Sequence, residues 1–210
     1  NSTVILSGSF QTTGGNNVSL AFNQTLTGIA TVRSASGRLG TLNTGASING
    51  TNMTTTTVLL NAAGRLEGIT VTGAYSGGAA GRVVQVADGS TGVVIENSII
   101  TGTQSGAAVG NVVTIGMNTS VTLRNSTITA TGSGAATAMT ALFANNANTT
   151  LTFADNTISA TGGTTNNIVN LGAGVTTILG GSTGNIHGGG NCAGTASSGS
   201  IGFTDGTSCP

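Results

Sequence analysis

The chain has 210 residues and a formal net charge of zero, with five Lys or Arg against five Asp or Glu. So few cations cannot neutralise the run of phosphates that nucleic-acid binding requires, and no apolar stretch reaches the roughly 20 residues of a membrane-spanning helix. Aromatic residues make up 3% of the chain and 36 residues are Gly. We therefore expect an interior of Val, Ile, Leu and Ala, which suits a narrow tube better than a globular core.

The first 60 residues are predicted to form N-terminal coils with one irregular segment. The stretch NQTLTG at 23–28 echoes a later NSTITATG and would place Asn23 over Asn125. One and a half repeat periods then separate this stretch from the first regular repeat, which a uniform repeat cannot accommodate. Residues 29–60 must contain a short coil, an insertion or a loop that leaves the coil, and the sequence does not choose among these.

Four copies of one phrase follow within residues 61–190. They are LEGITVTG at 66–73, VIENSIITG at 94–102, LRNSTITATG at 123–132 and FADNTISATG at 153–162. Their closing glycines are 29, 30 and 30 residues apart. Self-similarity at such a period indicates a repeat architecture, in which each unit buries its apolar side chains against its neighbours.

Each repeat is predicted to contain three short strands. In one unit these are VVTI at 112–115, VTL at 121–123 and TITAT at 127–131, separated by polar breaks. Apolar residues alternate with Thr and Ser, and this period of two is typical of strands. The fold class is therefore all-β: one domain with six or seven coils of a right-handed parallel β-helix, with about 29–30 residues per coil.

Equivalent positions of successive coils are expected to form vertical columns. Two columns should point inward: Leu66, Ile95, Leu123 and Phe153, and then Val71, Ile100, Ile128 and Ile158. A third column occupies the turn between these strands and contains Gly68, Asn97, Asn125 and Asp155. Asn adopts positive φ readily and can pass amide hydrogen bonds between coils, so a turn ladder is predicted there. The alternative is ordinary turn chemistry without a ladder.

Glu67 and Glu96 are the one carboxylate pair that the columns bring together. Two carboxylates one strand apart resemble the acid and nucleophile of a retaining glycosidase, so this pair is the catalytic candidate if the chain is a polysaccharide lyase or glycosidase. The register equally predicts an outward ion pair between Glu96 and Arg124, with Glu67 either unpaired beside it or paired to Arg65, and we favour this interpretation. No Cys, His and Asp cluster suggests a metal, and no cofactor is expected.

Hydroxyl side chains form a further array on the third strand of each coil. The outward residues are Thr70, Thr72, Thr101, Thr127, Thr129, Thr157 and Ser159, with Ile99 and Ser159 as the two departures from Thr. This T-x-T array resembles the ice-binding face of β-solenoid antifreeze proteins, which implies binding to ordered water. The alternative is that Thr occurs here because it is a good strand residue.

Residues 191–210 form a Gly- and Ser-rich tail that contains Cys192 and Cys209. A disulfide between them would close a capping loop over the end of the coil, whereas a reducing compartment would leave two free thiols. His187 is the single histidine and is expected to be a surface or packing residue. The predicted bridge and the scarcity of charge favour an extracellular or cell-surface location.

The repeat phrase also resembles the β-helical passengers of bacterial autotransporters and polymorphic outer-membrane proteins. Phe153 to Asn156 matches an F-x-x-N element of the latter, and residues 76–80 loosely match its G-G-A-I partner. The resemblance implies surface display or adhesion. We therefore expect a non-enzymatic solenoid that contacts a glycan or protein, or that self-associates into fibres, with N-glycans at N-x-S/T sites if the source attaches them. Ice binding is the alternative function.

Overall fold

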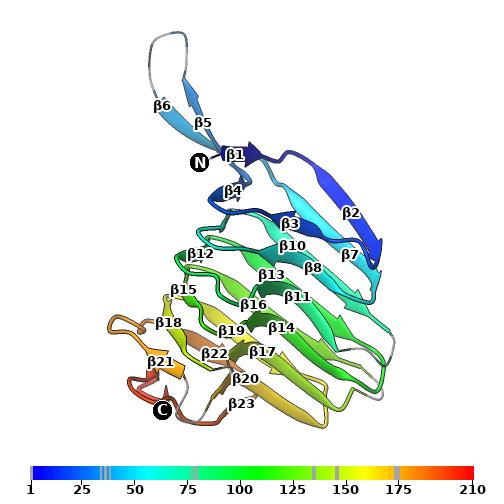
Figure 1. Ribbon diagram of the computed structural model, residues 1–210, viewed down its shortest axis with the longest axis vertical. Helices are drawn as coiled ribbons and strands as arrows, with labels where there is room; N and C mark the ends of the chain where they lie inside the picture. Colours follow the sequence, from blue (N-terminus) through cyan, green and yellow to red (C-terminus); the bar gives the residue numbers. More distant parts are fainter. Residues whose placement is uncertain are drawn as a thin grey trace.

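The computed structural model describes the chain except for residues 1, 34, 36, 38, 77, 79, 134–135, 145–146 and 173–175. Among the described residues the secondary structure consists of strands and turns, with no helix. Most strands belong to three parallel sheets, which run along the length of the molecule (Figure 1). Two residues of the 76–80 segment quoted for the resemblance, 77 and 79, lie outside the described part of the chain.

The three sheets each contain seven strands. Sheet A consists of β1 (Ser2–Ile5), β4 (Gln24–Thr27), β9 (Arg65–Glu67), β12 (Val93–Glu96), β15 (Ser120–Arg124), β18 (Thr149–Ala154) and β21 (Thr176–Ile178). Sheet B consists of β2 (Ser9–Gly14), β7 (Ser47–Met53), β10 (Thr70–Tyr75), β13 (Ile99–Gln104), β16 (Thr127–Gly132), β19 (Thr157–Thr161) and β22 (Ile186–Gly188). Sheet C consists of β3 (Val18–Leu20), β8 (Thr56–Leu60), β11 (Gly81–Val86), β14 (Val109–Ile115), β17 (Ala138–Ala144), β20 (Thr165–Leu171) and β23 (Asn191–Ala193).

The order in which the chain visits these sheets defines a parallel β-solenoid. It passes from sheet A to sheet B to sheet C and then begins the next coil, so each strand of these three sheets pairs with the strand one coil away. Ile100 pairs with Val71 on one side and with Ile128 on the other. The predicted fold is therefore confirmed, and the register of the two inward columns is the one expected from the sequence.

The closing glycines of the repeat phrase do not form a single column, although their spacing first indicated the repeat. Gly73 and Gly102 are in register, but Gly132 is not in register with them. Gly102 pairs with Ala130, while Gly132 pairs with Gln104. The coil step at this point is therefore 28 residues, because Ile100 pairs with Ile128. The third copy of the phrase is longer within its strand, so its closing glycine, Gly132, lies at the end of β16.

The interior is filled by the inward columns of all three sheets. Leu66, Ile95, Leu123 and Phe153 are each 0% exposed. Tyr75 is also buried, and its O–H donates to the carbonyl oxygen of Arg82 while lying 3.3 Å from the Thr57 hydroxyl oxygen. Burial raises the pKa of Tyr75 above its ordinary value of 10.0. Gly73 makes room for this ring, because a Cβ there would lie 2.8 Å from Cε2 of Tyr75.

The irregular N-terminal segment contains a hairpin that leaves the coil. Strands β5 (Ile29–Arg33) and β6 (Leu39–Asn43) pair antiparallel and project away from the three sheets (Figure 1). The chain then returns to sheet B through β7. The sequence left open a short coil, an insertion or a loop that leaves the coil for residues 29–60, and the structure shows a hairpin between β4 and β7.

The predicted placement of Asn23 over Asn125 is wrong. Strand β4 lies in sheet A, where Thr25 pairs with Arg65, and not in sheet B. Asn23, with φ of 58°, lies in the turn before sheet A, and its N–H donates to the carbonyl of Ala62 at 2.9 Å. Because the short T-L-T alternation occurs on strands of both sheets, this sequence similarity could not show to which sheet residues 23–28 belong.

Candidate binding face

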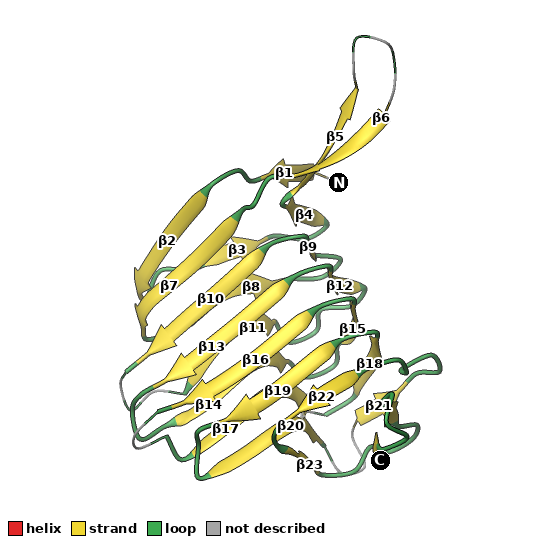
Figure 2. Cartoon of the chain, turned by 180° about the vertical axis from the view of Figure 1, so that it is seen from behind, coloured by secondary structure: helices red, strands yellow, loops and turns green. Residues whose placement is uncertain are grey.

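The outer face of sheet B is lined by hydroxyl side chains. Along β10, β13, β16 and β19 alternate residues are buried, and the residues between them are half-buried or exposed. Ten of these twelve outward positions are Thr or Ser. We call this surface the threonine face; it consists of Thr70, Thr72, Ala74, Ile99, Thr101, Thr103, Thr127, Thr129, Thr131, Thr157, Ser159 and Thr161. Figure 2 shows the four strands side by side.

All seven hydroxyl residues that the sequence singled out lie on the threonine face. The structure adds a third row, in which Thr103, Thr131 and Thr161 are in register. Sequence reasoning missed this row because it stopped at the T-x-T core of each copy. The signal was present, since TITAT at 127–131 already alternates over three outward positions.

The hydroxyls of this face are directed toward solvent and not into local side-chain pairs. Among the described residues, the side chains of the threonine face on β13, β16 and β19 make no hydrogen bond to another side chain. At the N-terminal edge the pattern changes, because the Thr72 hydroxyl donates to Oδ1 of Asn49 at 2.9 Å. Within a row, neighbouring residues are about 4.8 Å apart across the strands, and neighbouring rows are about 6.6 Å apart along the strands. The face is thus a regular lattice of methyl and hydroxyl groups.

The other two sheets carry different outward residues. On sheet A the outward positions include Arg65, Glu67, Glu96 and Arg124. On sheet C they include Arg82, Gln85, Phe143 and Asn170, and two consecutive residues of β11, Val83 and Val84, are both buried, which interrupts the alternation. Strand propensity alone would enrich Thr on all three sheets. Sheet A does carry outward threonines, at Thr25, Thr122, Thr150 and Thr152. What distinguishes sheet B is that its array covers four consecutive strands without a charged side chain.

The carboxylate pair on sheet A is part of an ion-pair cluster. Glu96 pairs in register with Glu67 and Arg124, as predicted. Nε of Arg124 donates to Oε2 of Glu96 at 2.8 Å, and the Arg65 guanidinium contacts Oε1 of the same carboxylate. Nε of Arg65 also lies 3.5 Å from Oε2 of Glu67. The side chain of Glu96 is 4% exposed, so this carboxylate faces two guanidinium groups and has little surface left for a substrate.

The turn ladder lies one residue later than predicted. Gly68, Asn97, Asn125 and Asp155 all have positive φ, but the side chains of Asn97, Asn125 and Asp155 are exposed. The buried ladder consists of Ser98, Ser126, Asn156 and Asn185. The side-chain oxygens of Ser126, Asn156 and Asn185 each accept the backbone N–H of the ladder residue in the preceding coil, at 3.2 Å, 3.0 Å and 3.0 Å respectively.

The backbone conformation explains why the ladder lies one residue later than predicted. A left-handed residue reverses the direction in which the next side chain points. The residue after each positive φ therefore points into the coil, where its polar atoms must be paired. Both polar atoms of the Asn156 amide are paired, since Nδ2 donates to the carbonyl of Leu123 at 3.0 Å and Oδ1 accepts from the N–H of Ser126, both in the preceding coil.

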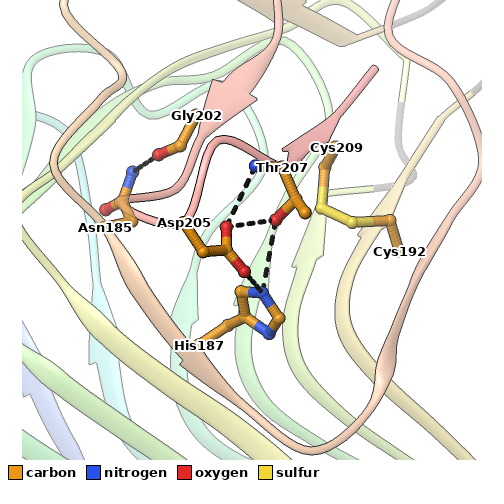
Figure 3. The surroundings of a disulfide bond; sticks show 7 residues. All are labelled: Asn185, His187, Cys192, Gly202, Asp205, Thr207 and Cys209. Atoms are coloured by element: carbon orange, nitrogen blue, oxygen red, sulfur yellow. Dashed lines mark hydrogen bonds and ion pairs between the residues drawn. A yellow bond between two sulfur atoms is a disulfide. The ribbon is translucent and has the colours of Figure 1, made fainter.

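The C-terminal tail closes its end of the solenoid. Cys192 and Cys209 form a disulfide with Cα atoms 5.4 Å apart, joining β23 to the small antiparallel pair β24 (Ile201–Gly202) and β25 (Ser208–Cys209) (Figure 3). Ile201 and Cys209 are 0% exposed. The predicted disulfide is confirmed, and it fixes the cap over the last coil.

Removing this bridge is expected to destabilise the cap. The double variant Cys192→Ala and Cys209→Ala should lower the free energy of unfolding by about 3 kcal/mol, because the unfolded chain regains the entropy of the closed loop. Urea denaturation followed by circular dichroism measures the change. The reduced wild-type protein should lose a similar amount, and a wild-type stability that does not respond to reductant would contradict a structural bridge.

His187 also belongs to the cap. Its Nε2 lies 3.0 Å from Oδ2 of Asp205 and 3.3 Å from the Thr207 hydroxyl (Figure 3). Its ring packs edge-on against Phe203 with centroids 4.7 Å apart. This is the packing role that the sequence predicted. Both polar partners approach the same ring nitrogen, so the group does not have the relay geometry of a nucleophile, a base and an orienting acid.

Asp205 makes the cap sensitive to acid. Hydrogen bonds from the Thr207 hydroxyl and backbone N–H, together with His187, lower the pKa of Asp205 below its ordinary value of 3.8. A depressed pKa in the folded state adds stability that is present above the unfolded pKa and lost as the pH falls through the folded pKa. We expect the thermal midpoint of the wild type to fall between pH 4 and pH 2 more than that of Asp205→Asn, as measured by calorimetry. Equal acid sensitivity of the two proteins would contradict this role.

Among the residues that the structure describes, no group of three or more His, Cys, Asp or Glu side chains could hold a metal ion. In the same part of the chain, no helix has the length and apolar character needed to cross a membrane. No family model matches the chain, and comparisons with curated proteins and with solved structures found no match. The comparisons thus give no support to a relationship with autotransporter passengers, and what stands is the parallel β-solenoid itself with its disulfide-closed end.

Proposed function

We propose that this chain is an extracellular, non-enzymatic β-solenoid that adheres to a partner surface, a glycan or a protein, through its threonine face. The observation that carries the proposal is the extent of the hydroxyl array on sheet B, which covers four consecutive strands without a charged side chain, whereas the outward threonines of sheet A share their sheet with Arg65, Glu67, Glu96 and Arg124. Sheets A and C serve as internal references, because the same solenoid geometry produces charged or bulky outward residues there.

The chemistry of threonine suits such a contact. Its β-branched side chain has few rotamers, so little conformational entropy is lost when the face is covered. Each residue offers a methyl group for apolar contact and a hydroxyl that both donates and accepts hydrogen bonds. With no ionised group on the threonine face, binding requires no desolvation of charge. The matching partner is therefore flat, uncharged and rich in polar groups.

The proposed location and the absence of catalysis have separate support. A structural disulfide persists in oxidising compartments, which supports an extracellular location. The carboxylate of Glu96 is occupied by Arg65 and Arg124, which argues against its use as a general acid or nucleophile.

A bulky residue in the middle of the threonine face tests the proposal. Thr129 lies between Thr101 and Ser159 in the central row, and a tyrosine there would hold a flat partner away from the rows around it. We expect Thr129→Tyr to weaken binding at least about tenfold, as for loss of a central contact residue. Binding to a glycan array and to immobilised cell-surface extracts measures the effect.

Thr122→Tyr is the matched control. Thr122 is an outward, half-buried threonine on sheet A, between Val94 and Thr152, so it tests the same substitution away from the threonine face. It should bind like the parent. A parent protein that binds neither glycans nor proteins, or two variants that weaken binding equally, would count against adhesion through sheet B.

Ice binding is the second candidate function, and the third threonine row favours it. Three rows about 6.6 Å apart, repeated about every 4.8 Å across strands, extend the resemblance to the ice-binding faces of β-solenoid antifreeze proteins. A thermal-hysteresis assay separates this function from adhesion. Ice binding would be supported if the parent protein were active, Thr129→Tyr abolished the activity and Thr122→Tyr retained it. An inactive parent protein would contradict ice binding.

A further inference from the structure

A hollow with a volume of about 430 Å³ lies on the outer side of sheet C, on a different sheet from the threonine face. Its lining comes from three successive coils, with Asn17 just before β3, Thr56 and Leu59 in β8, and Arg82 and Gln85 in β11. Figure 1 shows these three strands in succession along the solenoid. Small-ligand sites in proteins have volumes of about 300–1,000 Å³, so the hollow is large enough to be one.

The backbone of sheet C explains why its outer face is hollowed. Thr57 and Val83 drop out of the pairing between β8 and β11 and are buried, and the residue after each, Val58 and Val84, is buried as well. Two consecutive inward residues interrupt the pleat and bend the strand, as in a β-bulge. Outward residues beside this bend are recessed. Thr56 is 5% exposed, although its side chain lies on the outer face with Gln85.

Arg82 lines this hollow with unused hydrogen-bonding capacity. Of the three arginines whose side chains the structure describes, Arg65 and Arg124 pair with Glu96, whereas Arg82 makes no ion pair. Nε of Arg82 is buried and has no hydrogen-bond partner within the described part of the chain. A buried donor without a partner is costly, and a turn of the side chain toward a ligand would pair it. This cation therefore points to a ligand that accepts hydrogen bonds.

Gln85 and Asp88 are held by hydrogen bonds that leave part of each side chain free. Oε1 of Gln85 accepts from the Thr56 hydroxyl at 2.7 Å, which leaves the amide NH₂ group as a donor. Oδ1 of Asp88, in the turn after β11, accepts from the N–H of Met117 at 2.8 Å, which leaves Oδ2 as an acceptor. Because both side chains are already fixed, little conformational entropy is lost when a ligand binds them.

The lining combines these polar groups with apolar surface. Arg82 and Asp88 have opposite charges, and no ion pair joins them among the residues that the structure describes. Asn17 adds an amide, and Leu59 and Ala87 add apolar contact. Asp88 would repel an anion, and one carboxylate beside a guanidinium is a poor site for Ca²⁺, which needs several oxygen ligands. A neutral ligand with hydroxyls and C–H surface satisfies all of these groups at once.

We propose that the hollow on sheet C is a binding site for a neutral sugar. Adjacent hydroxyls of a sugar ring can accept hydrogen bonds from Arg82 and Gln85 and donate to the carboxylate of Asp88. The C–H groups of the ring can pack against Leu59. This site goes beyond the contact proposed for the threonine face, because the threonine face suits an extended flat surface, whereas the hollow takes one small ligand.

Chemical-shift mapping by nuclear magnetic resonance tests the proposal with four neutral disaccharides: maltose, lactose, cellobiose and diacetylchitobiose. Galacturonate is the anionic comparison. We expect at least one neutral sugar, at millimolar concentration, to shift the backbone amides of β8 and β11, and galacturonate to bind more weakly. Arg82→Met keeps an apolar stem without the guanidinium, and Gln85→Ala removes the amide. Each should weaken binding of that sugar at least about tenfold, as for loss of a ligand hydrogen bond.

Asn170→Ala is the matched control for Gln85→Ala. Asn170 is a half-buried amide in the same outward column of sheet C, beyond Thr114 and Phe143, and lies outside the hollow. It should bind the sugar like the parent, and circular dichroism establishes that the variants are folded. Shifts with none of the neutral sugars, tighter binding of galacturonate, shifts that map to sheet B, or equal weakening by Asn170→Ala would each overturn the proposal.

Thr129→Tyr distinguishes this site from the threonine face. Thr129 lies on sheet B, so its substitution should leave sugar binding in the hollow unchanged while it weakens adhesion. Conversely, Arg82→Met should leave adhesion through the threonine face unchanged. A failure of either proposal is therefore visible without affecting the other.

Discussion

Phe153→Ala is expected to lower the free energy of unfolding by about 3–5 kcal/mol, as for other fully buried phenylalanines. Phe153 is 0% exposed and lies in the inward column next to Leu123. The tube cannot contract to fill the space that the ring leaves, because the strand spacing is set by backbone hydrogen bonds between coils. The cavity term therefore adds to the lost burial of the ring. Urea denaturation followed by circular dichroism measures the change.

Phe143→Ala provides the control for this substitution. Phe143 is an outward, half-buried residue of β17 on sheet C, so the same change removes less buried surface and leaves no internal cavity. Its expected cost is below about 1.5 kcal/mol, in proportion to its smaller burial. Equal costs at the two positions would contradict the assignment of inside and outside along the strands.

Asn156→Leu is expected to destabilise the protein by about 3 kcal/mol or more, although leucine has a similar size. Asn156 is 1% exposed, and its side chain joins three coils by bonding to the N–H of Ser126, the carbonyl of Leu123 and Oδ1 of Asn185. Leucine would leave buried donors and acceptors without partners, at a cost of about 1–3 kcal/mol each. Denaturant unfolding and hydrogen exchange of the Ser126 amide provide the two measurements.

Asn170→Leu is the matched control for the ladder. Asn170 is a half-buried residue on the outer face of sheet C, so its replacement should change stability by less than about 1 kcal/mol. If Asn156→Leu were as well tolerated as Asn170→Leu, or if the Ser126 amide kept its protection in the Asn156 variant, the buried ladder would not stabilise the coils.

The columns could be predicted from sequence because the interior of a solenoid imposes the same requirement on every coil. Ile100 and Ile128 meet the same neighbours one coil apart, so their residue type and spacing reveal the register. The ion pair of Glu96 with Arg124 followed from that register, whereas the contact of Glu96 with Arg65 was not predicted, because Arg65 lies opposite Val94. Contacts between coils could be predicted because the repeat places the contacting residues a nearly fixed number of residues apart in the sequence.

Other features could not be predicted because they depend on local backbone geometry. Asn125 and Ser126 are both polar turn residues, and the left-handed conformation of Asn125 decides that the Ser126 side chain points inward. The β5–β6 hairpin occurs once in the described chain, so no column reveals it. The third threonine row was visible in the sequence but lay beyond the short motif that defined the array.

Inter-strand nuclear Overhauser effects in solution test the stacked coils and the threonine face most directly. We expect backbone contacts that place Ile100 between Val71 and Ile128, with the side chains of Thr101 and Thr129 adjacent and in contact with water. Contacts that pair Ile100 with any other strands, or that bury Thr101 and Thr129 in an interior, would contradict the solenoid and the surface proposed to bind its partner.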